Sequence, residues 1–320
     1  MDAQLFYVDL EAKPSVLQSL ASTLEGENPW DAENLTRANN YLFLGMGSSH
    51  YASSITAAQL RSLGIHATAE LASNPLLPKL DENTVIIATS ASGKSEETNL
   101  VIEALTSKHR VIALTNDSAS PLATMAASSV LMNAGVEEGG VVCRTYTHTL
   151  ALQRVLVNSV DGNNQTLTPV LNKSVEAMSF LLQTMEKWLP RFRETIVSPQ
   201  GSYFVAPSER MCNAQQSALM LREGPRKQAV GCESGDWSHV DVYLTKTIDY
   251  RMALFAGSRW ESNLMKWCTE RASTVVAIGA DIAGATYALR YPHDDEPAVR
   301  YFTESFIGEL LAADCWRNPE

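Results

Sequence analysis

The feature that most constrains the fold of this chain is an alternation of short, apolar, β-branched runs with longer segments of helical periodicity. In the first half, the runs that predict strands are 41–44, 66–71, 85–88, 111–115 and 129–132. The segments between them that predict helices are 50–63, 96–107 and 121–127. Strands that alternate with helices in this way indicate a parallel sheet with helices on both faces. Such sheets bind their ligands at the carboxyl ends of the strands.

The second half of the chain repeats this layout. Strands are predicted at 203–206, 241–244, 252–255 and 274–278, and helices at 209–223, 260–270 and 303–316. Further helices are predicted at 145–160, 169–194 and 13–25, the last with Pro14 in its first turn. A polar break at 161–165 lies between the two halves. We therefore predict an α/β fold with two related domains, residues 30–160 and 172–320.

Composition and charge narrow the class of protein. Hydrophobic residues make up 45% and charged residues 19% of the chain, as in a globular protein. The net charge of −11 and the lack of a Lys/Arg block argue against a nucleic-acid partner, which requires a basic surface. No apolar run approaches the roughly 18 residues of a membrane span, and the N-terminus lacks the pattern of a signal peptide. The five cysteines have no C-x-x-C spacing and are expected to be free thiols. We expect a cytoplasmic protein without a metal or other cofactor.

Two polar turns follow predicted strands. The turn at 90–95, Ser-Ala-Ser-Gly-Lys-Ser, precedes a helix with Glu96 and Glu97 in its first turn. The turn at 45–49 is Gly-Met-Gly-Ser-Ser. Backbone N–H groups and the helix dipole favour an anion at such a strand-to-helix turn, and both turns lie at strand ends where they can converge. The alternative is a serine-rich N-cap with nothing bound.

Together these residues resemble the SIS (sugar isomerase) domain family in its double-domain form, which includes the isomerase half of glucosamine-6-phosphate synthase. The match covers about residues 40–310 and rests on the turns at 45–49 and 90–95, on 115–122 and on 133–137. The resemblance implies two SIS domains, each a flavodoxin-like three-layer sandwich with a parallel sheet between helices. It also implies that the first domain holds the phosphate of a small anionic sugar. The residues expected to bind this substrate are Gly47, Ser48, Ser49, Ser90, Ala91, Ser92 and Ser95.

The second domain supplies the chemistry that the resemblance implies. Glu223, at the end of the predicted helix 209–223, matches the glutamate that moves a proton between C1 and C2 of the open sugar. His239 matches the histidine that opens the ring, and in the family it comes from the neighbouring subunit, which implies a homodimer. Glu137 is expected to lie close to the sugar. The alternatives are an exposed carboxylate at a helix end, a histidine on a surface loop and, for Glu137, a turn cap.

Three departures from the synthase affect the expected reaction. The chain shows no glutaminase domain and no cysteine after Met1, and its last lysine is Lys266, so no lysine matches the one in the synthase's C-terminal tail. Lys94 stands in the serine turn where the synthase has a glutamate. We therefore expect an aldose–ketose isomerase that acts on a sugar with a C6 phosphate or C6 sulfonate. The alternatives are an amino-sugar-6-phosphate or fructosamine-6-phosphate deaminase and a non-catalytic sugar-phosphate sensor.

Overall fold

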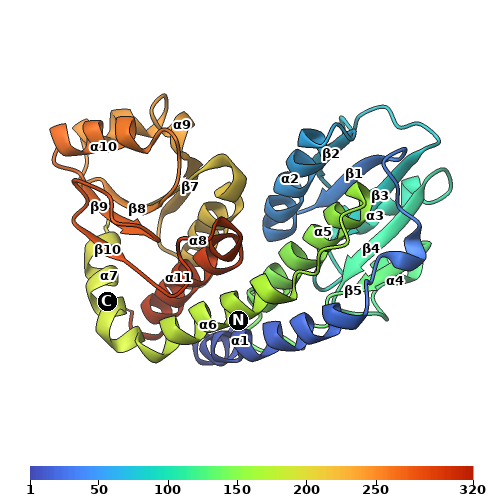
Figure 1. Cartoon of the computed structure of the whole chain (residues 1–320), viewed down its shortest axis with the longest axis horizontal. Helices are drawn as coiled ribbons and strands as arrows, with labels where there is room; N and C mark the ends of the chain where they lie inside the picture. Colours follow the sequence, from blue (N-terminus) through green and yellow to red (C-terminus); the bar gives the residue numbers. More distant parts are fainter. Residues whose placement is uncertain (320) are drawn as a thin grey trace. The chain divides into compact units, whose positions relative to one another are not determined.

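The computed structural model describes residues 1–319, which form two compact units that interleave along the sequence. Residues 16–136 and 144–169 make up the unit that we call domain 1. Residues 1–15, 137–143 and 170–320 make up the unit that we call domain 2. Each domain contains a five-stranded parallel sheet flanked by helices (Figure 1), so the α/β fold predicted from the sequence is confirmed.

In domain 1 the strands lie in the order β2-β1-β3-β4-β5. Their bounds are β1 Asn40–Gly45, β2 Ala67–Leu71, β3 Thr84–Thr89, β4 Arg110–Thr115 and β5 Ser128–Leu131. The helices are α2 Gly47–Ser62, α3 Glu96–Leu105, α4 Pro121–Met125 and α5 Arg144–Asp161, together with the C-terminal part of α1 Ala3–Gly26. Helices α3 and α4 bury Ile102 and Leu122 on one face of the sheet, and α2 packs with α5 on the other.

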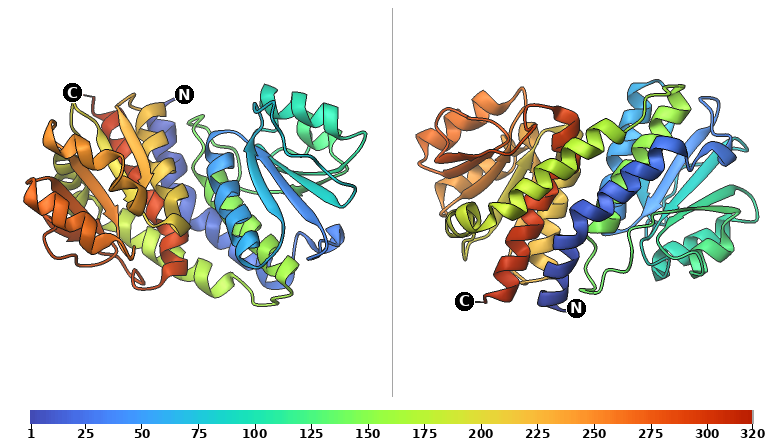
Figure 2. Two further views of the ribbon diagram at one scale, coloured as in Figure 1. Left: turned by 90° about the horizontal axis from the view of Figure 1, so that it is seen from above. Right: turned by 60° about the horizontal axis from the view of Figure 1, so that its bottom comes forward.

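Domain 2 has the same topology, because its strand order β10-β9-β8-β6-β7 is the order of domain 1 read from the other edge. Its strands are β6 Ser202–Ala206, β7 Ala229–Glu233, β8 Arg251–Phe255, β9 Thr274–Ile278 and β10 Tyr287–Leu289. Its helices are α6 Thr168–Gln183, α7 Met185–Ile196, α8 Met211–Glu223, α9 Ser234–Trp237, α10 Glu261–Glu270 and α11 Pro297–Arg317, with α6 beginning in domain 1. Figure 2 shows the long helix α11 beside α8 in both views.

Glycines allow the helices of domain 2 to approach one another and the sheet. A Cβ at Gly231 of β7 would lie 2.5 Å from the carbonyl oxygen of Ala214 in α8, and a Cβ at Gly308 of α11 would lie 2.3 Å from the Cβ of Ser217 in α8. Any side chain at either position would therefore push α8 away. This packing holds the N-terminal half of α8 against β7 and α11.

Three predictions about local structure were wrong. Segment 241–244 is not a strand but part of a 3-10 helix, Asp241–Lys246, and the strand in this region is β7. Asp241 is buried there, and two hydrogen bonds to its Oδ2 compensate for the loss of water. They come from the Tyr250 hydroxyl at 3.2 Å and from Cys232 Sγ at 3.6 Å. The helix predicted at 13–25 begins at Ala3, so Pro14 is inside it. The single helix predicted at 169–194 is two helices, α6 and α7.

Both sheets have a topological switch point, where the chain leaves adjacent strands in opposite directions. In domain 1 it lies between β1 and β3, and in domain 2 between β6 and β8. Loops that follow two such strands leave a crevice between them, which is the usual ligand site of a sheet with this strand order. The switch points therefore define where a site is expected in each domain.

Candidate functional site

The two polar turns of domain 1 flank its switch point. Gly45, the last residue of β1, pairs with Thr89, the last residue of β3, so the turns that follow begin side by side. A Cβ at Gly45 would lie 2.9 Å from the Cβ of Ser49 and 3.1 Å from the carbonyl oxygen of Thr89. Glycine at this position therefore lets the first turn of α2 approach the end of β3, where the second turn begins.

The turn at 90–95 has a backbone that requires glycine. Gly93 has a φ of +61°, and a Cβ there would lie 2.1 Å from Ser120 Oγ. Its N–H donates to the Ser90 carbonyl at 3.0 Å, and its carbonyl accepts from the Leu122 N–H at 3.2 Å. The Ala91 carbonyl accepts from the Asn116 N–H at 3.0 Å. These bonds hold the turn against the neighbouring loop, as a preformed anion site requires.

The serines of this turn differ in their surroundings. Ser95 is the N-cap of α3: its hydroxyl accepts from the Thr98 N–H at 3.3 Å and donates to Glu97 Oε2 at 3.0 Å. Ser95 therefore caps the helix, as the alternative interpretation of this turn as a serine-rich N-cap expects. Ser92 Oγ accepts from the Lys94 N–H at 3.2 Å and is exposed, whereas Ser90 is buried. Hydrogen bonds from its own backbone N–H and from Ser95 lower the pKa of Glu97.

Lys94 projects away from the turn into solvent. Its side chain is 66% exposed, and its Nζ lies 3.7 Å from Asp117 Oδ2. An exposed pair of this length contributes little to stability. Lys94 thus places a positive charge beside the turn, next to the negative charge of Asp117.

The turn at 45–49 contributes the start of α2. The helix begins at Gly47, which has a φ of +50°, and its N-cap Met46 offers no side-chain hydrogen bond. Ser48 is buried and Ser49 is half-buried in the first turn of α2. The Ser49 and His50 N–H groups donate to the Met46 carbonyl oxygen at 3.1 Å and 3.5 Å, so what this end of α2 offers an anion is chiefly the positive end of the helix dipole.

Glu223 ends α8 in domain 2 and lines a pocket of about 410 Å³. The other residues that line it are Met1, Gly224, Pro225, Arg226, Cys315, Trp316 and Pro319. Burial raises the pKa of the Glu223 carboxyl, and the negative charge of Glu137 raises it further. Burial disfavours the charged form of the carboxyl because it removes water, and a nearby negative charge disfavours it by repulsion. The structure thus brings two of the predicted site residues, Glu137 and Glu223, together in one domain.

His239 lies on the loop that follows α9 and is exposed. The backbone N–H of His239 donates to the Asp236 carbonyl oxygen at 2.8 Å. Trp237, two residues earlier, is fully buried and donates from Nε1 to the Tyr250 hydroxyl at 2.8 Å. Trp237 therefore anchors a loop that presents His239 to solvent. His239 is not among the residues that line the Glu223 pocket.

The switch point of domain 2 holds an ion pair in place of a polar turn. Arg210, which follows β6, donates from Nε to Glu304 Oε2 at 2.9 Å, and both side chains are buried. Arg300 of α11 donates to the carbonyl oxygen of Ala256, which follows β8, at 2.9 Å. Sequence reasoning missed these three residues, because nothing in the local sequence distinguishes a buried arginine from an exposed one. The polar turns that were predicted to bind an anion therefore lie in domain 1 alone.

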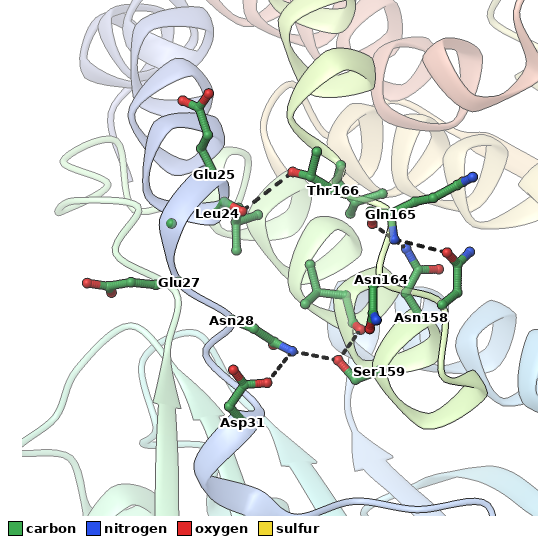
Figure 3. A pocket seen from close by; sticks show the side chains of 14 residues that line it. Leu24, Glu25, Glu27, Asn28, Asp31, Asn158, Ser159, Asn164, Gln165 and Thr166 are labelled. Carbon is green, nitrogen blue, oxygen red and sulfur yellow. Dashed lines mark hydrogen bonds between the residues drawn. The ribbon is translucent and has the colours of Figure 1, made fainter.

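A second pocket, of about 400 Å³, lies in domain 1 between the C-terminal end of α1 and the loop after α5 (Figure 3). Asn28 Nδ2 donates there to Asp31 Oδ1 at 2.7 Å and to Ser159 Oγ at 2.8 Å. None of the predicted site residues lines this pocket. Within residues 1–319, no group of His, Cys, Asp or Glu side chains is arranged to hold a metal ion, and no helix is both long and apolar enough to span a membrane.

Comparison with known proteins agrees with this geometry. Residues 34–159 match the family model of the SIS domain. Glutamine–fructose-6-phosphate aminotransferase (isomerizing) of Bacillus subtilis is 22% identical over 253 residues, which cover 74% of this chain and 42% of that protein. The chain thus spans less than half the length of this curated relative.

Solved structures show the same fold over nearly the whole chain. The C-terminal domain of glucosamine-fructose-6-phosphate aminotransferase from Francisella tularensis superposes with a TM-score of 0.82 at 14% identity, covering 98% of this chain and 96% of that one. Tagatose-6-phosphate ketose/aldose isomerase from Escherichia coli gives 0.75 at 16% identity, covering 98% and 93%. Glucosamine-6-phosphate deaminase from Thermotoga maritima gives 0.75 at 18% identity, covering 98% and 94%.

Proposed function

We propose that this protein is an aldose–ketose isomerase that acts on a sugar with an anionic group at C6, because residues 34–159 match the family model of the SIS domain. The observation that carries the proposal is the pair of polar turns at the switch point of domain 1, which begin side by side and would form one cradle of serines and backbone N–H groups. Such a cradle suits a tetrahedral oxyanion. A phosphate and a sulfonate both present three oxygens to it.

The anion is proposed to be held by both turns. Gly47, Ser48 and Ser49 contribute the N-terminus of α2, and Ser90, Ala91, Ser92 and Ser95 contribute the turn before α3. Helix dipoles and N–H groups stabilise the negative charge at both positions. This binding energy fixes one end of the sugar and so limits the orientations that the reacting carbons can adopt.

Glu223 is proposed to carry the proton between C2 and C1. A carboxylate takes the C2 proton of the open aldose while O1 gains a proton, which gives the enediol. The enediol then loses the proton on O2 as the carboxylic acid returns a proton to C1, which gives the ketose. A base works best when its pKa lies near the working pH, and burial together with the charge of Glu137 moves the pKa of Glu223 upward from its usual value. The enzyme should therefore lose activity as the pH falls through this raised pKa, because Glu223 then becomes protonated.

His239 is proposed to open the sugar ring by moving a proton between the ring oxygen and the anomeric hydroxyl. We further propose that the protein is a homodimer in which each site receives His239 from the partner subunit. The exposure of His239 supports this, as does the exposed apolar surface beside it, where Val240 is 57% and Tyr243 is 64% exposed. Apolar side chains exposed together are common at subunit interfaces.

A deaminase is the second candidate, since the fold is shared with a glucosamine-6-phosphate deaminase and the same enolic chemistry would release ammonia from an amino sugar. A sugar-phosphate sensor would bind these ligands and convert none. An NMR assay with aldose and ketose 6-phosphates, amino-sugar 6-phosphates and 6-sulfonates distinguishes the three. We expect aldose–ketose interconversion of at least one 6-anionic sugar. Ammonia release would favour the deaminase, and saturable binding without any product would favour the sensor.

Replacing Ser92 tests the anion site. Ser92→Ala is expected to raise KM for the anionic sugar by about tenfold or more, since a hydrogen bond to a charged group is lost. The value of kcat should fall less, because the anion is bound equally in the ground and transition states. Steady-state kinetics measure both constants.

Ser118→Ala is the matched control, because Ser118 is an exposed serine in the neighbouring turn of the same domain. It should leave KM unchanged. An unaltered KM in Ser92→Ala, with no competition by inorganic phosphate or sulfate, would refute the assignment of the turn.

A further inference from the structure

Residues 137–143 form a segment between β5 and α5 that we call the Glu137–Cys143 strap. The strap is part of domain 2, although the residues on both sides of it belong to domain 1. Its first residue, Glu137, carries the charge that acts on Glu223. The contacts that hold the strap within domain 2 therefore decide where this charge lies.

The N-terminal turns of α1 hold the middle of the strap through Gly139. The Gly139 N–H donates to Asp9 Oδ2 at 2.7 Å, and the Gly139 carbonyl accepts from the Asp2 N–H at 3.1 Å. A Cβ at Gly139 would lie 2.4 Å from the Cα of Phe6, so the strap backbone lies directly against α1. Asp9 is only 3% exposed, and a charge-assisted bond shielded from water is a strong one.

Helix α8 holds the far end of the strap. Gln216 donates from Nε2 to the carbonyl oxygen of Val142 at 3.1 Å. Gln216 lies two helical turns before Glu223, and residues at this spacing share one face of a helix. The strap is thus bound to the face of α8 that ends in Glu223.

The side chain of Glu137 is fixed within the strap itself. Its Oε1 accepts a hydrogen bond from the Cys143 N–H at 2.7 Å, and the Gly140 N–H donates to its carbonyl oxygen at 3.1 Å. The carboxylate therefore moves with the strap, and what positions the strap positions the charge.

The other titratable groups around the strap and the Glu223 pocket come from several elements. They are Asp9 and Lys13 of α1, the Met1 amine, Glu138 and Cys143 of the strap, Arg144 of α5, whose guanidinium donates to the Val136 carbonyl oxygen, Glu309 and Cys315 of α11, and Arg226 after α8. Lys13 Nζ lies 2.5 Å from Glu309 Oε2, and both side chains are fully buried, so these two charges compensate each other. Arg226 is exposed to solvent, where its charge is screened. This leaves Glu137 as the charge that most affects Glu223.

We propose that Asp9 is a positioning residue for the base Glu223. By holding the Glu137–Cys143 strap, Asp9 keeps the carboxylate of Glu137 in place next to the face of α8 that ends in Glu223. The inference rests on the proposed role of Glu223, but its test reads the titration of Glu223 directly and needs no substrate.

The experiment is a pH titration of the full chain labelled with ¹³C at the glutamate carboxyls, in which Glu223→Gln identifies the Glu223 resonance. Asp9→Ala removes the acceptor of the Gly139 bond and is expected to lower the titration midpoint of Glu223 by about half a pH unit or more, since a neighbouring negative charge moves away. Asp9→Asn keeps an acceptor oxygen and should stay close to the wild-type midpoint. Gly139→Ala displaces the strap by a different route and should act like Asp9→Ala, which provides a reading should Asp9→Ala fail to fold.

A double-mutant cycle and a matched control isolate the effect. Glu137→Gln alone should lower the midpoint, and Asp9→Ala should add nothing in that background. Asp294→Asn, which alters another buried carboxylate of domain 2 at a distance from the strap contacts, should leave the midpoint unchanged. A wild-type midpoint in folded Asp9→Ala and Gly139→Ala, or an equal shift in Asp294→Asn, would overturn the inference. If the titration behaves as expected and no sugar is converted, the proposed function is wrong and the positioning role of Asp9 stands.

Discussion

Glu223→Gln is expected to lower kcat by about a thousandfold while KM stays close to the wild-type value, because general base catalysis typically contributes factors of this size. Glutamine has nearly the same shape as glutamate and does not accept a proton near neutral pH. The turns proposed to bind the anion lie in domain 1 and are unchanged by the substitution, so the sugar should still bind. Initial rates over a range of sugar concentrations, with binding measured separately by calorimetry, test both parts of this expectation.

Glu270→Gln is the matched control, since Glu270 is also the last residue of a helix in domain 2, at the end of α10. Its activity should equal that of the wild type. If Glu223→Gln retained a kcat near the wild-type value, another group would be the base, and the raised pKa of Glu223 would be only a consequence of burial.

The second large effect concerns the assembly of the site. Glu223→Gln and His239→Ala should each be inactive alone, and mixing the two chains is expected to restore activity. In a two-fold dimer that exchanges histidines, each mixed dimer contains one site with both an intact Glu223 and an intact His239. Random reassortment of equal amounts should therefore recover about a quarter of wild-type activity.

Subunit exchange in mild denaturant, with mass spectrometry to count mixed dimers, provides this measurement. Each variant treated alone in the same way is the control and should stay inactive. Inactivity of proven mixed dimers would show that Glu223 and His239 act from the same chain. A protein that stays monomeric at assay concentrations, with full activity, would also refute the shared site.

The sequence predicted structure best where a local pattern of residues is enough to define the element. The strands of domain 1 and the turn at 90–95 could be predicted because buried parallel strands are apolar runs and because Gly93 needs a backbone that few other residues adopt. The edge strand β7 could not be predicted, since it is short and contains Gly231, which is there for the close approach of α8. The apolar alternation at 241–244 suggested a strand instead. In the structure that segment is a 3-10 helix held by the buried Asp241.

The surroundings of the base could not be predicted at all. Glu137 was found through the family resemblance, but its neighbours are set by tertiary contacts between segments far apart in the sequence. Asp9 meets Gly139, and Lys13 meets Glu309, across long stretches of chain. Single acidic or basic residues on an amphipathic helix give no sign that they are buried. The same is true of Arg210 and Glu304 at the second switch point.

The most direct test of the account is proton NMR of the wild-type protein with a 6-anionic aldose in D₂O. We expect ketose to form and the hydrogen at C2 of the aldose to be replaced by deuterium over repeated turnovers, because a carboxylic acid exchanges its proton with solvent. Glu223→Gln should abolish both changes. Interconversion with the C2 hydrogen fully retained, or binding without any exchange, would contradict the proposal that this protein moves a proton through Glu223.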